Sequence, residues 1–138
     1  MTGVQTCALP ICATATDTVV ITIIDYSVTA NAGADQNTSV GQAFVLDGSA
    51  STTLNGTTIT EYKWTATSGF GEDNLMEWIR TTPTLTLTPK ATDVNTTFTL
   101  TATNDAGKTN QDTVYVIVTA TATTKTAQTK SKIGRAHV

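Results

Sequence analysis

The side chains that could carry catalysis or bind a metal are few in this chain. Among its 138 residues there is one histidine, His137, and there are two cysteines, Cys7 and Cys12. The 11 Asp and Glu residues are scattered, whereas glycoside hydrolysis needs two carboxylates fixed across a cleft. No Gly-rich run with a lysine is present for holding phosphate. The sequence therefore predicts no catalytic, cofactor-binding or metal-binding residue, and no enzyme.

Both ends of the chain differ abruptly in composition from the middle. Residues 2–11 (TGVQTCALPI) resemble a translated reading frame of a widely used sequencing adapter, and residues 133–138 (IGRAHV) resemble its translated reverse complement. We interpret residues 1–12 and 133–138 as adapter-derived and exclude them from the fold. Under this interpretation Cys7, Cys12 and His137 do not belong to the natural protein. The sequence then gives little support for a disulfide and provides no imidazole for catalysis.

The charge pattern narrows the classes of partner. The chain has 11 acidic and 8 basic residues and a formal net charge of −3. All the acids lie between Asp17 and Asp112, where the basic residues are Lys63, Arg80, Lys90 and Lys108. A nucleic-acid surface needs clustered Lys and Arg, and a membrane span needs about 18 consecutive apolar residues. The sequence argues against both.

The strongest structural signal is residues 58–68 (TITEYKWTATS), which we predict to be a β-strand. Tyr62 and Trp64 are two positions apart, so their side chains point to the same face of a strand. Two such aromatic side chains bury on the order of 300–500 Å². Trp64 is therefore expected at the centre of a small all-β core.

Residues 69–80 (GFGEDNLMEWIR) allow two interpretations. Met76 and Trp78 alternate with Glu77, which indicates a short strand, whereas Leu75, Trp78 and Ile79 have helical spacing. We favour the strand because a β-sandwich needs one here. The preceding Gly69-Phe70-Gly71 is interpreted as a loop tip.

The middle of the chain carries a series of motifs in a specific order. Residues 30–51 (ANAGADQNTSVGQAFVLDGSAS) are followed by Tyr62-Lys63-Trp64, and later by residues 104–107 (NDAG) and 112–118 (DTVYVIV). Together they resemble the polycystic-kidney-disease-type repeat, the PKD domain, over residues 26–119. The resemblance implies an immunoglobulin-like (Ig-like) antiparallel β-sandwich with Trp64 in its core.

The alternation of apolar and polar residues agrees with that fold class. About seven short strands are expected, separated by turns such as Asn55-Gly56 and residues 104–108. They are predicted at residues 28–34, 43–46, 58–68, within 69–80, and at 84–87, 96–103 and 112–118, and residues 36–40 are expected to form a short edge segment. Asp47 is expected to accept hydrogen bonds from backbone N–H groups in the turn Asp47-Gly48-Ser49. The expected core is Phe44, Leu46, Tyr62, Trp64, Leu85, Leu87, Phe98, Leu100, Val114 and Val116.

Residues 17–23 (DTVVITI) resemble residues 112–118 (DTVYVIV), which we take as the last strand of the module. Similarity at a domain-sized interval suggests tandem repeats. Residues 13–25 are therefore interpreted as the last strand of a truncated preceding repeat, although two Val-rich strands can also be alike by chance. Residues 120–132 are rich in Thr and Lys and are predicted to be a linker.

Calcium is the one ligand that the resemblance raises. Some PKD domains bind it near the start of the module through acidic loop residues, and the matching positions here are Asn31, Asn55 and Asp105. Calcium takes six to eight oxygen ligands. Related loops often read Asp-x-Asp-Gly where this chain has Thr53-Leu54-Asn55-Gly56, so two charges are missing. We predict no tight metal site and retain these residues as candidates for a weak one.

Two classes of function fit this interpretation. The favoured one is a non-catalytic extracellular or cell-surface module of a tandem-repeat protein. It would act as a spacer or in adhesion, and its Thr-rich faces or the Trp78 region would contact protein or carbohydrate. The alternative is an accessory module of a secreted protease or polysaccharide hydrolase. The expected partners are neighbouring Ig-like repeats and extracellular protein or polysaccharide, and the module is expected to be monomeric.

Overall fold

The computed structural model describes residues 15–121, which contain nine β-strands and no helix. The strands are β1 (Val28–Thr29), β2 (Gln36–Ser39), β3 (Phe44–Asp47), β4 (Thr52–Thr53), β5 (Ile59–Phe70), β6 (Leu75–Arg80), β7 (Thr84–Leu87), β8 (Thr96–Asn104) and β9 (Thr109–Thr119). Within this described part, no helix is present that is long and apolar enough to cross a membrane.

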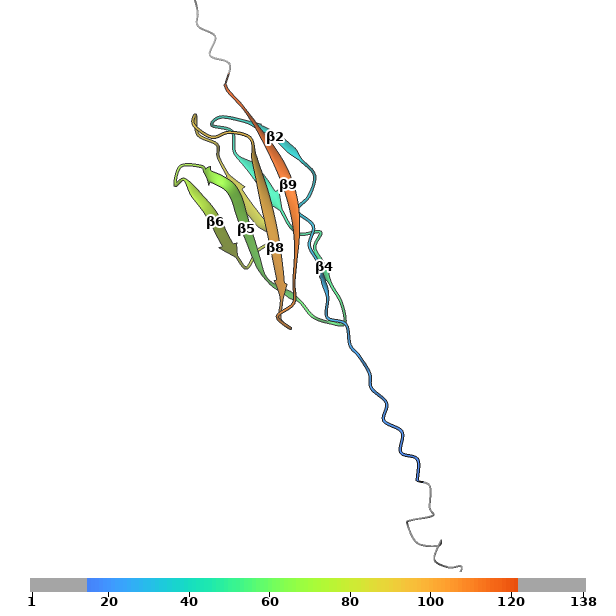
Figure 1. Ribbon diagram of the computed structural model, residues 1–138. Coiled ribbons are helices and arrows are strands. Elements are labelled where there is room, and N and C mark those ends of the chain that lie inside the picture. The colour runs from blue at the N-terminus through green and yellow to red at the C-terminus, as the bar shows by residue number, and fades with distance from the viewer. Residues whose placement is uncertain (1–14, 122–138) are drawn as a thin grey trace, which may run out of the picture.

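The strands are arranged as a sandwich (Figure 1). One layer is a five-stranded sheet in the order β2-β9-β8-β5-β6, and the other contains the pair β3-β7, with β1-β4 as a separate short pair. All paired strands are antiparallel except β2 and β9, which run parallel. The predicted all-β, Ig-like sandwich is confirmed. The strand count is nine rather than about seven because the expected edge segment forms a full strand, β2, and because the loop between β3 and β5 contains the two-residue β4.

The core is built from the inward-facing residues of these strands. In β8, alternate residues are buried along the whole strand, including the predicted Phe98, Leu100 and Ala102. Trp64 on β5 lies opposite Leu100 on β8 and opposite Trp78 on β6. All ten residues that were predicted to form the core are in the buried cluster, together with Ala32, Ala66, Phe70 and Trp78. The strand periodicity therefore identified most of the core.

The interpretation of Gly69-Phe70-Gly71 as a loop tip is wrong. Phe70 is the last residue of β5 and is buried. Its ring packs edge-to-face against Phe44 and Phe98, with centroid distances of 5.8 and 5.1 Å, a favoured geometry for aromatic pairs. The turn begins one residue later, and β6 then pairs back on β5 from Leu75. For residues 75–80 the strand interpretation is confirmed and the helical one is excluded.

The turn after β3 forms as expected. The backbone N–H of Ser49 donates to Asp47 Oδ1 at 2.8 Å. This hydrogen bond, with a smaller contribution from the Ser49 side chain, lowers the pKa of Asp47 from its ordinary value of 3.8. The stabilisation is therefore present above pH 3.8 and is lost as the pH falls through the lower folded-state pKa. NMR titration of the Asp47 carboxyl should give a midpoint below 3.8; a midpoint at or above that value would contradict this account.

Gly48, in the same turn, is packed against the core. A Cβ atom here would lie 2.8 Å from Leu100 Cδ2 and 3.2 Å from Tyr62 Cδ1. Both side chains are buried, so Gly48→Ala should force them to move and lower the free energy of unfolding by about 1–3 kcal/mol. Urea denaturation measures this change. Ala50→Ser, at a nearby exposed position, is the control, and an equally small effect of both substitutions would argue against the packing described.

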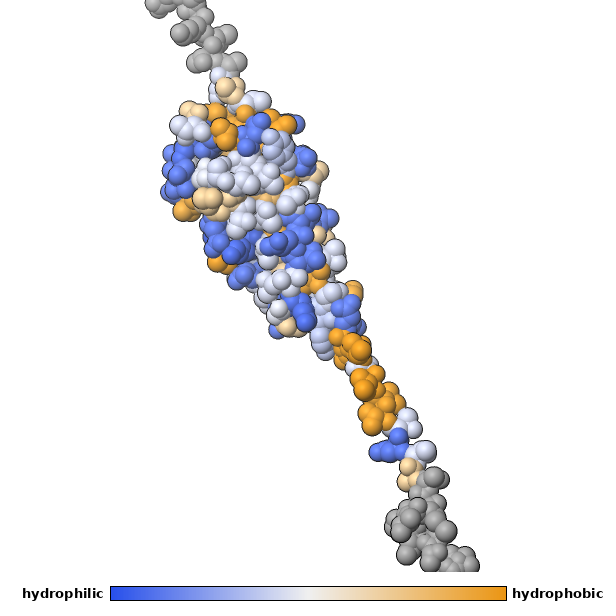
Figure 2. Space-filling model, viewed as in Figure 1, coloured by the Kyte–Doolittle hydropathy of each residue, from blue (hydrophilic) through white to orange (hydrophobic). Residues whose placement is uncertain are grey.

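The segment before β1 differs from the sandwich. Residues 15–27 form no strand, and Val19, Val20, Ile21, Ile23 and Ile24 are each more than half exposed. Figure 2 shows these apolar side chains gathered along the stalk that leads into the sandwich. The assignment of this segment to a preceding repeat stays a prediction. The adapter interpretation of residues 1–12 and 133–138, and most of the predicted linker 120–132, lie outside the described residues.

Candidate functional site

The most densely hydrogen-bonded polar group lies at the end of the sandwich where the chain enters. We call this the linker end; it comprises residues 25–27, 53–58 and 104–108. Asn104, the last residue of β8, is only 2% exposed. Its Oδ1 accepts from the backbone N–H groups of Ala106 at 3.1 Å and Lys108 at 2.8 Å. Its Nδ2 lies 2.7 Å from the Tyr26 carbonyl oxygen.

Two threonine hydroxyls complete the surroundings of the Asn104 amide. Thr53 Oγ1 and Thr57 Oγ1 lie 3.1 and 3.2 Å from its Nδ2. A buried amide is costly unless its donors and acceptors are paired, and here both ends of the amide are. Asn104 thus joins three separate segments: the incoming chain, the loop after β4 and the turn before β9. The sequence indicates a turn at Asn104, because Asn is common in turns, but it does not predict this burial.

The three calcium candidates have separate local partners. Asn31 Oδ1 accepts from the Gly33 N–H at 2.9 Å, and Asn55 Nδ2 donates to the Asp25 carbonyl at 2.6 Å. Asp105 accepts from Thr58 through both carboxylate oxygens, each at 3.3 Å. Among residues 15–121, no group of three or more His, Cys, Asp or Glu side chains is placed to hold a metal ion. The geometry adds no support for a calcium site at these positions.

A shallow depression lies beside the β5–β6 turn. Its volume is about 190 Å³, and it is lined by Phe70, Gly71, Glu72, Asp73, Trp78, Thr86, Leu87 and Thr88. Pockets that enclose small-molecule ligands usually measure about 300–1,000 Å³. The depression is therefore too small to bury such a ligand.

The outward face of the five-stranded sheet is rich in threonine. We call it the Thr-rich face; it comprises Glu61, Lys63, Thr65 and Thr67 of β5, Thr97, Thr99, Thr101 and Thr103 of β8, and Gln111, Thr113 and Tyr115 of β9. The register places Lys63 beside Thr101 and Thr101 beside Gln111. Hydroxyls and one exposed aromatic ring are therefore presented in rows across the strands.

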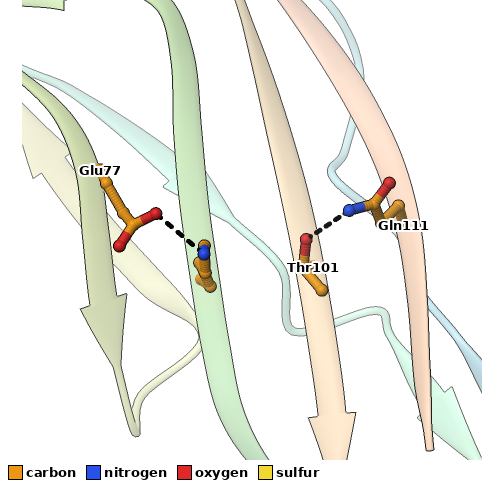
Figure 3. Close-up of polar contacts among 4 residues, drawn as sticks. Glu77, Thr101 and Gln111 are labelled. Atoms are coloured by element: carbon orange, nitrogen blue, oxygen red, sulfur yellow. Dashed lines mark hydrogen bonds and ion pairs between the residues drawn. The ribbon is translucent and has the colours of Figure 1, made fainter.

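Polar contacts tie neighbouring strands together on this face (Figure 3). Lys63 Nζ lies 2.8 Å from Glu77 Oε2, and Gln111 Nε2 donates to Thr101 Oγ1 at 2.9 Å. The hydrogen bond and the negative charge of Glu77 raise the pKa of Lys63. Both groups of the ion pair are solvent-exposed, so the pair contributes little to stability. These contacts shape the surface without forming a reactive centre.

The expectation that the Trp78 region contacts a ligand stays a prediction, and the indole itself is largely buried. Trp78 is only 7% exposed. Its ring packs on Phe98, with a centroid distance of 6.0 Å. The exposed apolar residues of this strand are its neighbours, among them Met76 and Ile79. Trp78 is a core residue on an edge strand.

Comparison with known protein families agrees with the sandwich topology and the buried Trp64. A family model described as "K319L-like, PKD domain" matches residues 32–118, which is more than half of the chain. The chain belongs to this PKD domain family. The resemblance inferred from the sequence motifs is thereby confirmed.

Two solved structures are similar to this PKD domain. One is the solution structure of the PKD domain from KIAA 1837 protein, with 22% identity and a TM-score of 0.46, covering 75% of this chain and 95% of that one. The other is from the Clostridium thermocellum CbhA fibronectin(III)-like modules, with 14% identity and a TM-score of 0.42, covering 67% of this chain and 97% of that one. No curated protein sequence matches this chain.

Proposed function

We propose that this PKD domain is a non-catalytic spacer module of an extracellular or cell-surface protein built from tandem Ig-like repeats. The observation that carries the proposal is the position of the two chain ends. The chain enters the sandwich beside β4 and leaves it from β9 at the opposite end (Figure 1). Modules joined through such ends extend a chain along one direction. The segment with exposed apolar residues before β1 supports a further repeat upstream.

The Thr-rich face is the surface on which this module would contact extracellular protein or carbohydrate. Threonine hydroxyls and the exposed Tyr115 provide hydrogen-bonding groups and an aromatic surface, which are common in recognition of polar partners. Acidic side chains predominate over basic ones in the module, which does not favour a polyanionic ligand. Adhesion through this face is compatible with the spacer role.

The arrangement of neighbouring modules can be tested directly on the source DNA. Long-read sequencing across both ends of the coding sequence should reveal further copies at a domain-sized interval and no adapter-like peptides. A catalytic domain encoded next to the module would instead support the accessory module of a secreted protease or polysaccharide hydrolase. Adapter-like peptides that persist in the genomic sequence would return Cys7, Cys12 and His137 to the protein.

A binding assay tests whether the module binds an extracellular polymer in addition to acting as a spacer. The full chain is mixed with insoluble chitin, cellulose or collagen, and the protein left in solution is quantified. For a module that acts only as a spacer we expect the same unbound fraction as for a non-binding control protein. Retention that Tyr115→Ser abolishes, and that Thr60→Ser on β5 leaves intact, would assign polymer binding to the Thr-rich face, and the neighbouring domains in the source DNA would then separate adhesion from a substrate-holding accessory module.

A further inference from the structure

The linker that leads into the sandwich is held by the sandwich itself. The Asp25 carbonyl accepts from Asn55 Nδ2 at 2.6 Å, and the Tyr26 carbonyl accepts from Asn104 Nδ2 at 2.7 Å. The Ser27 carbonyl accepts from the Leu54 N–H at 3.2 Å and from Thr53 Oγ1 at 3.4 Å. All three successive carbonyls are therefore bound to the loop after β4 or to the end of β8.

A second set of contacts fixes the linker internally. The Asp25 carboxylate accepts from the Ser27 backbone N–H at 2.8 Å and from its hydroxyl at 3.2 Å. The side chain of Asp25 thus closes a local turn directly before β1. Immediately before it lies Ile24, the last exposed apolar residue of the segment that precedes β1. Order in the linker therefore extends up to the boundary of the unpaired segment.

The unpaired segment, residues 17–24, has the sequence pattern of the last strand of a module but pairs with no other strand in the described part of the chain. Val114 and Val116 of β9 are buried in this module, and the matching residues Val19 and Ile21 are exposed. If residues 17–24 complete a preceding sandwich, only residues 25–27 separate it from β1. Three residues span at most about 10 Å, a short distance beside the radius of gyration of a module of this size, about 13 Å. The end of the preceding sandwich would therefore lie within about 10 Å of the linker end, close enough for the two modules to contact each other.

We propose that the linker end is a docking surface for the preceding Ig-like repeat of the same chain, and that Asn104 fixes the relative orientation of the two modules. The inference rests on the tandem arrangement proposed above. Leu54 offers an exposed apolar contact on this surface, next to the loop that holds the linker. Asn104 acts from beneath it as a positioning residue, because its amide binds the linker, the loop and the turn together.

The first test uses the full chain and backbone ¹⁵N relaxation. Residues 25–27 should have order parameters of about 0.85, as in the strands, whereas unpaired residues 18–23 should fall below about 0.6. Asn104→Ala should lower the values of residues 25–27 toward those of the segment before them. Asn95→Ala is the matched control, because Asn95 Oδ1 accepts from the Val118 N–H instead. Low order at residues 25–27 in the unsubstituted chain would overturn the proposal.

The second test concerns docking and uses a two-module chain in which a copy of residues 26–118 directly precedes Ile24. Both modules should show one shared rotational correlation time, longer than that of the single module. Asn104→Ala in the second module should make the two modules tumble independently, and Asn95→Ala should not. If Asn104→Ala loses the dispersed amide spectrum of a folded protein, Asn55→Ala, at an exposed position, takes its place.

The outcomes distinguish this inference from the proposed function. Independent tumbling of the unsubstituted two-module chain would overturn the docking surface while leaving a tandem array intact. Absence of neighbouring repeats in the source DNA would instead overturn the array, whatever the order in the linker. Shared tumbling that is lost on removing the Asn104 or Asn55 amide supports the docking surface.

Discussion

Trp64→Ala should lower the free energy of unfolding by about 3–5 kcal/mol. Trp64 is fully buried and lies between Leu100 and Trp78 in one row of the large sheet. Removing its indole leaves a cavity that the surrounding strands can fill only in part. Because a domain is stabilised by roughly 5–15 kcal/mol in total, the variant should unfold at a much lower urea concentration. An unchanged denaturation midpoint would contradict the placement of Trp64 at the centre.

Trp64→Phe separates the packing of this residue from its polar group. Among the described residues, Trp64 Nε1 is the one buried side-chain nitrogen or oxygen without a hydrogen-bond partner. Phenylalanine keeps an aromatic ring and removes this unpaired N–H, whose burial is itself unfavourable. We therefore expect Trp64→Phe to be clearly less destabilising than Trp64→Ala. Equal losses for the two variants would show that ring packing is not the main contribution.

Trp78→Ala should lower the free energy of unfolding by about 3 kcal/mol, at the lower end of the range for such substitutions. The residue packs on Phe98, but it lies on β6, at the edge of the sheet, where the chain can relax toward the cavity. The midpoint of urea denaturation measures the change. A loss of ligand retention without a loss of stability would contradict the core position of Trp78.

Met76→Ala is the matched control for this prediction. Met76 is two residues earlier on the same strand, so it points to the same face, yet it is 53% exposed. Its substitution should change stability by no more than about 0.5 kcal/mol, as is usual for surface positions. A large effect of Met76→Ala would mean that the face of β6 is covered over its whole length.

The contrast between Met76 and Trp78 shows what sequence periodicity can and cannot predict. Alternation fixes which residues share a face of a strand, and this correctly placed the apolar residues of β8 in the core. It does not tell how far the opposing layer extends over that face. Trp78 is buried against Phe98 of β8, whereas Met76 is exposed, so the depth of each position depended on packing against other strands.

Phe70 and Asn104 were misjudged for related reasons. Two flanking glycines made Phe70 appear to belong to a loop, but its ring reaches Phe44 and Phe98 on other strands. Asn104 lies in a segment with a turn composition, and its burial depends on Tyr26, Thr53 and Thr57, which lie 78, 51 and 47 residues earlier in the chain. Local propensity carries no information about such partners.

The parallel pairing of β2 with β9 affects how the module folds. Gln36 lies opposite Val116, so one of the first strands is completed by the last one. The chain loses entropy when this long loop closes, and this loss comes before any contact compensates for it. Folding is therefore slow, on the order of milliseconds to seconds for β-sandwiches. During synthesis the edge of β2 that pairs with β9 remains unpaired until Thr119 has left the ribosome. That edge of a nascent chain is therefore open to pairing with other chains for most of its translation.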